Sequence, residues 1–149
     1  MAFKFKRILV PVSRDKASEE ALRLACLIAR QSKARLYVVH VIEVKRALPL
    51  DAEVTTDLRE AEEILKRAED ICADEDCELE TDLLQAREIS DAIIEEAETR
   101  EVDLIVLGTD YKVSFGFHRM SDTVIKSVRN AKCRVLLLQE PAPVKGKAV

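Results

Sequence analysis

The stretch FKRILVPVSRDKASEEALRLACLIAR, residues 5–30, contains the pattern from which the fold can be deduced. Its first eight residues are mostly apolar and β-branched, which predicts a strand over residues 5–12. After it, Ala21, Leu24, Ala25 and Ile28 recur at helical spacing, which predicts a helix over residues 13–30. The stretch therefore encodes a strand, a turn and a helix in succession.

The rest of the chain repeats this alternation. Three further helices are predicted from helical spacing, over residues 53–73, 89–101 and 121–131. Four further strands are predicted, over residues 34–42, 77–84, 102–108 and 133–140. The segment CELETDLL, residues 77–84, alternates apolar with acidic residues, as an edge strand with one solvent-facing side does.

The order of elements is therefore βαβαβαβαβ, which favours an α/β fold. Strict alternation implies a parallel sheet wrapped by helices and joined by right-handed crossovers. We expect a single domain over residues 1–139. Residues 140–149, with two prolines and little apolar surface to bury, are expected to form a disordered tail.

Composition excludes several classes of protein. Charged residues make up 35% of the 149 residues, but the net charge is only -4, so no basic field attracts nucleic acid. The longest strongly apolar runs reach only about seven residues, and a bilayer-spanning helix needs about 20. The N-terminus lacks a signal-peptide pattern, so we expect a cytoplasmic protein. Together with the charge balance and the short apolar runs, this predicts a protein that neither spans a membrane nor binds nucleic acid.

The four cysteines form no C-x-x-C pair and lie far in sequence from the two histidines, so no metal site is predicted. We expect four reduced thiols, three of them buried. Cys72 and Cys77 are the only close pair, which leaves a regulatory disulfide between them open. His40 lies inside an apolar strand and is interpreted as a hydrogen-bonded interior residue rather than a catalytic base.

Several segments together resemble those of the universal stress protein family over about residues 5–139. They are RILVPV (7–12) followed by SEEALRLA (18–25), VVHVIE (38–43), DLIVLGT (103–109) and NAKCRVLLL (130–138). The resemblance implies an open parallel five-stranded sheet of strand order 3-2-1-4-5 with helices on both faces. This single-domain architecture is Rossmann-like, of the adenine nucleotide alpha hydrolase type.

That strand order implies a crevice beyond strands 1 and 4, where the winding reverses and the loops after Val12 and Leu107 meet. Family members that bind ATP carry G-x-x-G-x9-G-[S/T] after strand 4. Here Gly108 matches the first glycine, but Tyr111, Ser121 and Asp122 stand at the other three positions. Ser13 also replaces the aspartate that these members usually place after strand 1.

The substitutions predict a degenerate nucleotide loop, because Tyr111 adds a ring where bare backbone is needed and Asp122 adds a negative charge beside phosphate. The leading hypothesis is therefore a non-enzymatic regulatory protein with no cofactor. By resemblance we expect a homodimer formed through the last strand, Arg134 to Gln139, and an unidentified protein partner.

An alternative hypothesis is a sensor in which AMP, ATP or another anion occupies the altered crevice. The candidate binding residues are Pro11, Ser13, Val41, Gly108, Tyr111, Ser121, Asp122 and Thr123. Arg14, Lys112, His118 and Arg119 could supply positive charge, and Thr109 a further hydroxyl. ATP hydrolysis is the weakest hypothesis, because no phosphate cradle, metal ligand or catalytic base stands out.

Overall fold

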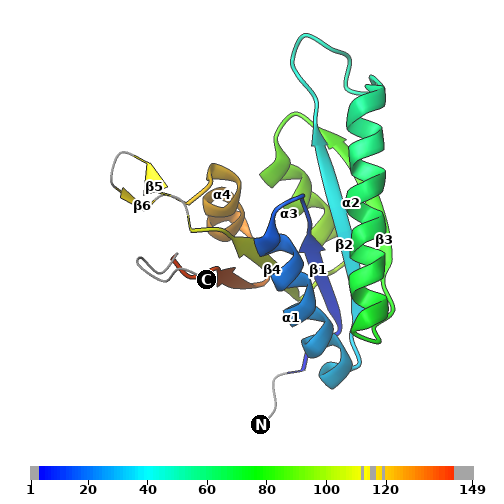
Figure 1. Cartoon of the computed structure of the whole chain (residues 1–149), viewed down its shortest axis with the longest axis vertical. Coiled ribbons are helices and arrows are strands. Elements are labelled where there is room, and N and C mark those ends of the chain that lie inside the picture. Colours follow the sequence, from blue (N-terminus) through cyan, green and yellow to red (C-terminus); the bar gives the residue numbers. More distant parts are fainter. Residues whose placement is uncertain (1–3, 112, 115–116, 119, 143–149) are drawn as a thin grey trace, which may run out of the picture.

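The computed structural model describes residues 4–111, 113–114, 117–118 and 120–142. Five strands form one parallel sheet in the order β3-β2-β1-β4-β7 (Figure 1). They are β1 (Arg7–Pro11), β2 (Arg35–Glu43), β3 (Glu80–Ala86), β4 (Leu104–Thr109) and β7 (Arg134–Gln139). The predicted fold class and strand order are confirmed, and the strand with alternating acidic residues, β3, lies at one edge.

Four helices cover the two faces of this sheet (Figure 1). They are α1 (Lys16–Ser32), α2 (Thr55–Asp74), α3 (Ile89–Thr99) and α4 (Asp122–Asn130). Side chains alternate along β1, so Ile8 and Val10 pack with α1 and α2, whereas Leu9 packs on the other face with Ile93 of α3. Each face thus has its own apolar core, as expected for an open α/β sheet.

Two element boundaries differ from the predicted ones for local reasons. Helix α1 begins at Lys16 rather than residue 13, because the Asp15 carboxylate caps it by accepting a hydrogen bond from Ser18 N at 2.8 Å. Strand β3 begins at Glu80 rather than residue 77. After α2 the chain turns through Asp76 with φ of 54°, and Cys77 N donates back to Cys72 O at 2.9 Å.

Between β4 and α4 the chain forms a short antiparallel hairpin of β5 (Val113–Ser114) and β6 (Phe117–His118). The hairpin lies to one side of the sheet in Figure 1. The sequence predicted only a loop here. Of the expected disordered tail, residues 143–149 lie outside the described residues, so that prediction stays a prediction.

All four cysteines are free, and two of them form a close pair. Cys26 of α1 and Cys72 of α2 are fully buried, with their Sγ atoms 3.6 Å apart, whereas Cys77 and Cys133 are half-buried. The expectation of three buried thiols was therefore wrong by one, and the thiol of Cys72 contacts that of Cys26. The hydrogen bond to Cys72, with burial, raises the pKa of the Cys26 thiol, which favours an unreactive packing role.

None of the described helices combines the length and the apolar character that crossing a membrane requires.

Candidate functional site

A hollow of about 250 Å³ lies at the carboxyl ends of β1 and β4, where the strand order reverses. The loop after β1 forms one wall, and the end of β2 and the first turns of α3 and α4 form the others. The residues lining it are Pro11, Val12, Ser13, Asp15, Ser18, His40, Val41, Ile89, Ile93, Leu107, Gly108, Ser121, Thr123 and Val124. Among these described residues only Asp15 and His40 are titratable.

The wall from the β1–α1 loop is held by three polar side chains. The Ser13 hydroxyl lies 3.0 Å from Asp15 Oδ2 and 3.1 Å from Ser18 Oγ, and Ser18 Oγ accepts from Ser13 N at 3.1 Å. The capping bond from Ser18 N to Asp15 Oδ1 closes the arrangement. We call residues 13–18 the partition loop. It presents a carboxylate and two hydroxyls to the hollow, and the Asp15 carboxylate lies two residues beyond the position where the family resemblance places an aspartate.

His40 and Val41 form the wall at the end of β2. His40 Nδ1 lies 2.8 Å from the backbone oxygen of Val12. A carbonyl oxygen only accepts hydrogen bonds, so Nδ1 carries a proton and donates it in this contact. This geometry fits the interpretation of His40 as a hydrogen-bonded, half-buried residue. The contact also ties the end of β1 to β2 beside the hollow.

Gly108, near the end of β4, is required for packing. A Cβ atom at this position would lie 2.1 Å from the backbone oxygen of Ala17 and 2.5 Å from its carbonyl carbon. Only glycine lets the first turn of α1 approach β4 this closely. The family resemblance assigns this glycine to phosphate binding, but contact with α1 already accounts for it.

The beginning of α4 forms the last wall. Ser121 is its N-cap and accepts a hydrogen bond from Val124 N at 3.3 Å, while Thr123 and Val124 face the hollow. Asp122 is exposed at the first helical position, where the positive end of the helix dipole favours an acidic side chain. Neither Asp122 nor the half-buried Tyr111 lines the hollow. The structure therefore brings together six of the eight predicted binding residues.

Of the four predicted positive charges, only Arg14 has a described side chain, and it does not line the hollow. Arg14 turns toward α2, where its guanidinium lies 3.2 Å from Glu60 Oε1 and 3.0 Å from Glu63 Oε2. Lys112, Arg119 and the side chain of His118 lie outside the described residues. No lysine or arginine is among the described lining residues. In the same described part of the chain, no group of His, Cys, Asp and Glu is arranged to hold a metal ion.

Sequence reasoning missed Asp15, Ser18 and the apolar floor of Ile89 and Ile93. A signal for Asp15 was present, since aspartate just before a run of helical apolar spacing is a residue type that begins helices, but no signal in the sequence pointed to Ser18. Ile89 and Ile93 recur at helical spacing, which predicted only a helix over residues 89–101. Periodicity could not show that the first turn of α3 ends at the crevice.

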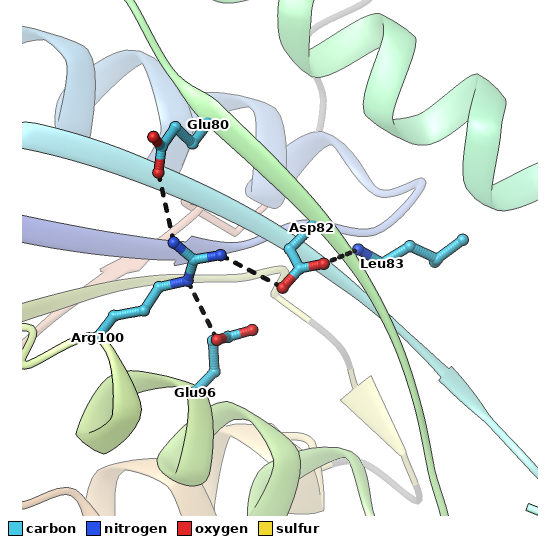
Figure 2. Close-up of polar contacts among 5 residues, drawn as sticks. All are labelled: Glu80, Asp82, Leu83, Glu96 and Arg100. Atoms are coloured by element: carbon cyan, nitrogen blue, oxygen red, sulfur yellow. Dashed lines mark hydrogen bonds and ion pairs between the residues drawn. The ribbon is translucent and has the colours of Figure 1, made fainter.

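A second polar cluster lies between α3 and β3 (Figure 2), and none of its residues lines the hollow. Arg100, which follows α3, lies 3.1 Å from Glu96 Oε1 and 3.4 Å from both Glu80 Oε2 and Asp82 Oδ2. The guanidinium also lies 4.6 Å from the centre of the Tyr37 ring. We call Arg100, Glu80, Asp82 and Glu96 the Arg100 cluster. It joins a helix to the edge strand and faces no part of the hollow.

Comparison with known proteins gives a consistent result. The model of the universal stress protein family matches residues 4–139 of this chain. A universal stress protein from Methanocaldococcus jannaschii is 28% identical over 143 residues, which cover 92% of this chain and 84% of that protein.

Solved structures of the same family superpose on most of the chain. A universal stress protein from Archaeoglobus fulgidus has a TM-score of 0.72 at 25% identity, covering 90% of this chain and 93% of the other. A universal stress protein from Archaeoglobus fulgidus in complex with dAMP has a TM-score of 0.71 at 25% identity, covering 91% and 98%.

Proposed function

The chain belongs to the universal stress protein family, and we propose that it is a cytoplasmic regulatory protein without catalytic activity that binds a nucleoside or nucleoside monophosphate. The ligand would occupy the hollow at the carboxyl ends of β1 and β4. The observation that carries this proposal is the hollow itself, at the reversal point of the sheet where open α/β folds bind ligands. Its walls offer both apolar surface and hydroxyl groups.

The chemistry of the walls supports a ligand of low charge. The Asp15 carboxylate suits the hydroxyl groups of a sugar, which can donate hydrogen bonds to it. It would repel a triphosphate, for which the described lining residues supply no lysine or arginine. The free backbone N–H groups in the first turn of α4 can still donate hydrogen bonds to one phosphate group. This arrangement combines a degenerate triphosphate loop with retained binding of a smaller nucleotide.

The dAMP complex of the 25% identical Archaeoglobus protein supports the same ligand class. A nucleoside monophosphate has the planar base, sugar and single phosphate that the apolar floor, the partition loop and the start of α4 could accept. These contacts need no acid, base or metal to act on the ligand. Binding without chemistry is therefore the function that the site supports best.

We expect AMP and dAMP to raise the thermal unfolding temperature saturably, and ATP to do so less. A ligand that binds only the folded state stabilises it by about 2.7 kcal/mol at 100 times its Kd. Isothermal titration of the same ligands gives the affinities. If none of the three nucleotides produces a shift or heat at millimolar concentration, the binding proposal is wrong.

A matched pair of variants locates the site. Thr123→Phe places a ring in the hollow and is expected to abolish the AMP effect, whereas Val128→Phe adds the same ring at an exposed position of the same helix and should leave it unchanged. Phosphate release from ATP, measured with and without magnesium, serves as the control for catalysis. Turnover above background would contradict the assignment as a non-enzyme.

A second function rests on the edge strand β7, through which we propose that two copies pair and present a surface to a protein partner. Strand β7 pairs with β4 on one side and lies at the edge of the sheet on the other. Leu136 on this strand is 37% exposed, and an apolar edge strand is a natural site for self-pairing.

We expect a homodimer in sedimentation at micromolar concentration. Leu136→Lys is expected to shift the protein to a monomer, because it places a charged lysine on the edge strand of each copy, and a charged side chain there opposes edge-to-edge pairing. Leu27→Lys is the matched control, since Leu27 is an exposed leucine of α1. A wild-type monomer, or a dimer that persists in Leu136→Lys, would exclude pairing through β7.

A further inference from the structure

A second cavity, of about 130 Å³, lies between α1 and α2. Its floor is apolar and consists of Val12, Leu22, Ile64, Ala68 and Ile71, all of which belong to the buried core of this face of the sheet. Its rim carries charged side chains from the partition loop, α1 and α2. Of the residues that the sequence suggested for ligand binding, Ser13 and Arg14 line it.

The charges on the rim neutralise one another. Arg14 lies 3.0 Å from Glu63 and 3.2 Å from Glu60, and Arg67 lies 2.9 Å from Glu19, so both cations of the rim are paired with carboxylates. All of these side chains except that of Glu19 are more than half exposed. Exposed ion pairs contribute about 1 kcal/mol or less, so they can separate to admit a ligand. A paired rim above an apolar floor selects against a charged occupant, because a charge would lose its hydration without gaining a partner.

This cavity shares a wall with the hollow. Val12, Ser13 and Ser18 line both, so the hydrogen-bonded partition loop separates the two spaces. Movement of Ser13 or Ser18 toward one space moves its hydroxyl away from the other. Occupancy of the cavity therefore bears directly on the wall that a ligand in the hollow would contact.

We propose that the cavity between α1 and α2 binds a small uncharged apolar group, and that its occupancy changes the affinity of the hollow for its ligand. The size is suitable, since an engineered cavity of about 150 Å³ lined by aliphatic and aromatic side chains binds benzene. The binding site stands on the cavity alone. Its coupling to the hollow rests on the proposed function and, by thermodynamic linkage, acts equally in both directions.

Benzene is the probe for the binding site, followed by amide chemical shifts and thermal unfolding. We expect saturable shifts at residues of the floor, at millimolar benzene. Acetyl-phenylalanine amide is the second probe. If benzene binds and the amide does not, the site is one for free small molecules. If the amide also binds, the site accepts an apolar group carried on a larger molecule. Saturation by neither probe would overturn the proposal.

Two variants test the location. Ala68→Leu fills the cavity and is expected to abolish the benzene shifts, whereas Ala73→Leu makes the same change at an exposed position of the same helix and should preserve them. Ala68→Val adds less volume and replaces the leucine variant if that protein does not fold. Benzene binding that survives filling of the cavity would place the site elsewhere and contradict the proposal.

Coupling is measured by titrating AMP with and without saturating benzene. We expect the Kd for AMP to change at least about 5-fold, a typical lower bound for coupled sites. An unchanged Kd would overturn the coupling. If AMP does not bind at all, the proposed function fails, while the benzene result still decides whether the cavity is a binding site.

Discussion

Gly108→Ala is expected to lower the free energy of unfolding by about 3 kcal/mol, at the upper end of the usual cost of overpacking. The added methyl group would lie 2.1 Å from the backbone oxygen of Ala17, which no change of side-chain rotamer can relieve. Either α1 must move away from β4 or the end of β4 must distort. Urea unfolding of the two proteins, followed by circular dichroism, measures the loss.

The double variant Gly108→Ala with Ala17→Gly tests whether the loss comes from a clash with the backbone of Ala17 rather than with its side chain. Removing the Ala17 side chain leaves its carbonyl group in place, so stability should not recover. A loss below about 1 kcal/mol would show that α1 adjusts at little cost and that close packing does not require glycine here. Because any side chain at this position meets α1, variants of Gly108 are poor probes of ligand binding, and Thr123→Phe serves that purpose better.

The fold was predictable because its signals are local. Unbroken apolar runs mark β1, β2 and β4, and a regular apolar stripe marks α2, so element types and order follow from periodicity. The strand order came from the family resemblance, not from periodicity. The hairpin of β5 and β6 was not predicted, since its two-residue strands are too short to show alternation.

The candidate site was predictable only in part, because side-chain direction depends on tertiary packing. Gly108 and Ser121 both line the hollow, as the motif spacing indicated, and Thr123, a separate candidate binding residue, lines it too. Asp122 has the right position in sequence, yet it begins α4 and turns to solvent. The pairing of Cys26 with Cys72 likewise depends on how α1 packs on α2, which sequence spacing does not reveal.

The Arg100 cluster depends on one cation that serves three carboxylates (Figure 2). Glu96 is only 9% exposed, and its Oε2 atom is buried without a hydrogen-bond partner among the described residues. Burial, and next the neighbouring Asp82 carboxyl, raises the pKa of Glu96 against the opposing effect of Arg100. A protonated Glu96 could donate a hydrogen bond to the Asp82 carboxylate. Protonation of Glu96 therefore removes the repulsion between the two carboxylates, which share one guanidinium.

The pH dependence follows from the direction of this shift. Because folding raises the pKa of Glu96, protonation of this residue stabilises the folded state. This contribution to the free energy of unfolding is fully present below the unfolded pKa of about 4.5. It is lost as pH rises through the folded-state pKa. Glu96→Gln keeps an oxygen for Arg100 and adds an amide donor for Asp82. We expect this variant to exceed the wild type in stability by about 1 kcal/mol above neutral pH, and the difference to shrink toward pH 5.

Arg100→Leu should have the larger effect, a loss of about 3 kcal/mol at pH 7, because it leaves the buried Glu96 carboxylate beside Asp82 without a cation. The loss should decrease on acidification, as protonation of Glu96 removes the uncompensated charge. Adding Glu96→Gln to Arg100→Leu should restore about half of the stability, whereas Glu95→Gln, at an exposed neighbouring position, should restore none. Chemical unfolding of these variants between pH 5 and 8 measures each difference. Equal losses at both ends of that range would mean that Arg100 acts through its packing on Tyr37 rather than through its charge.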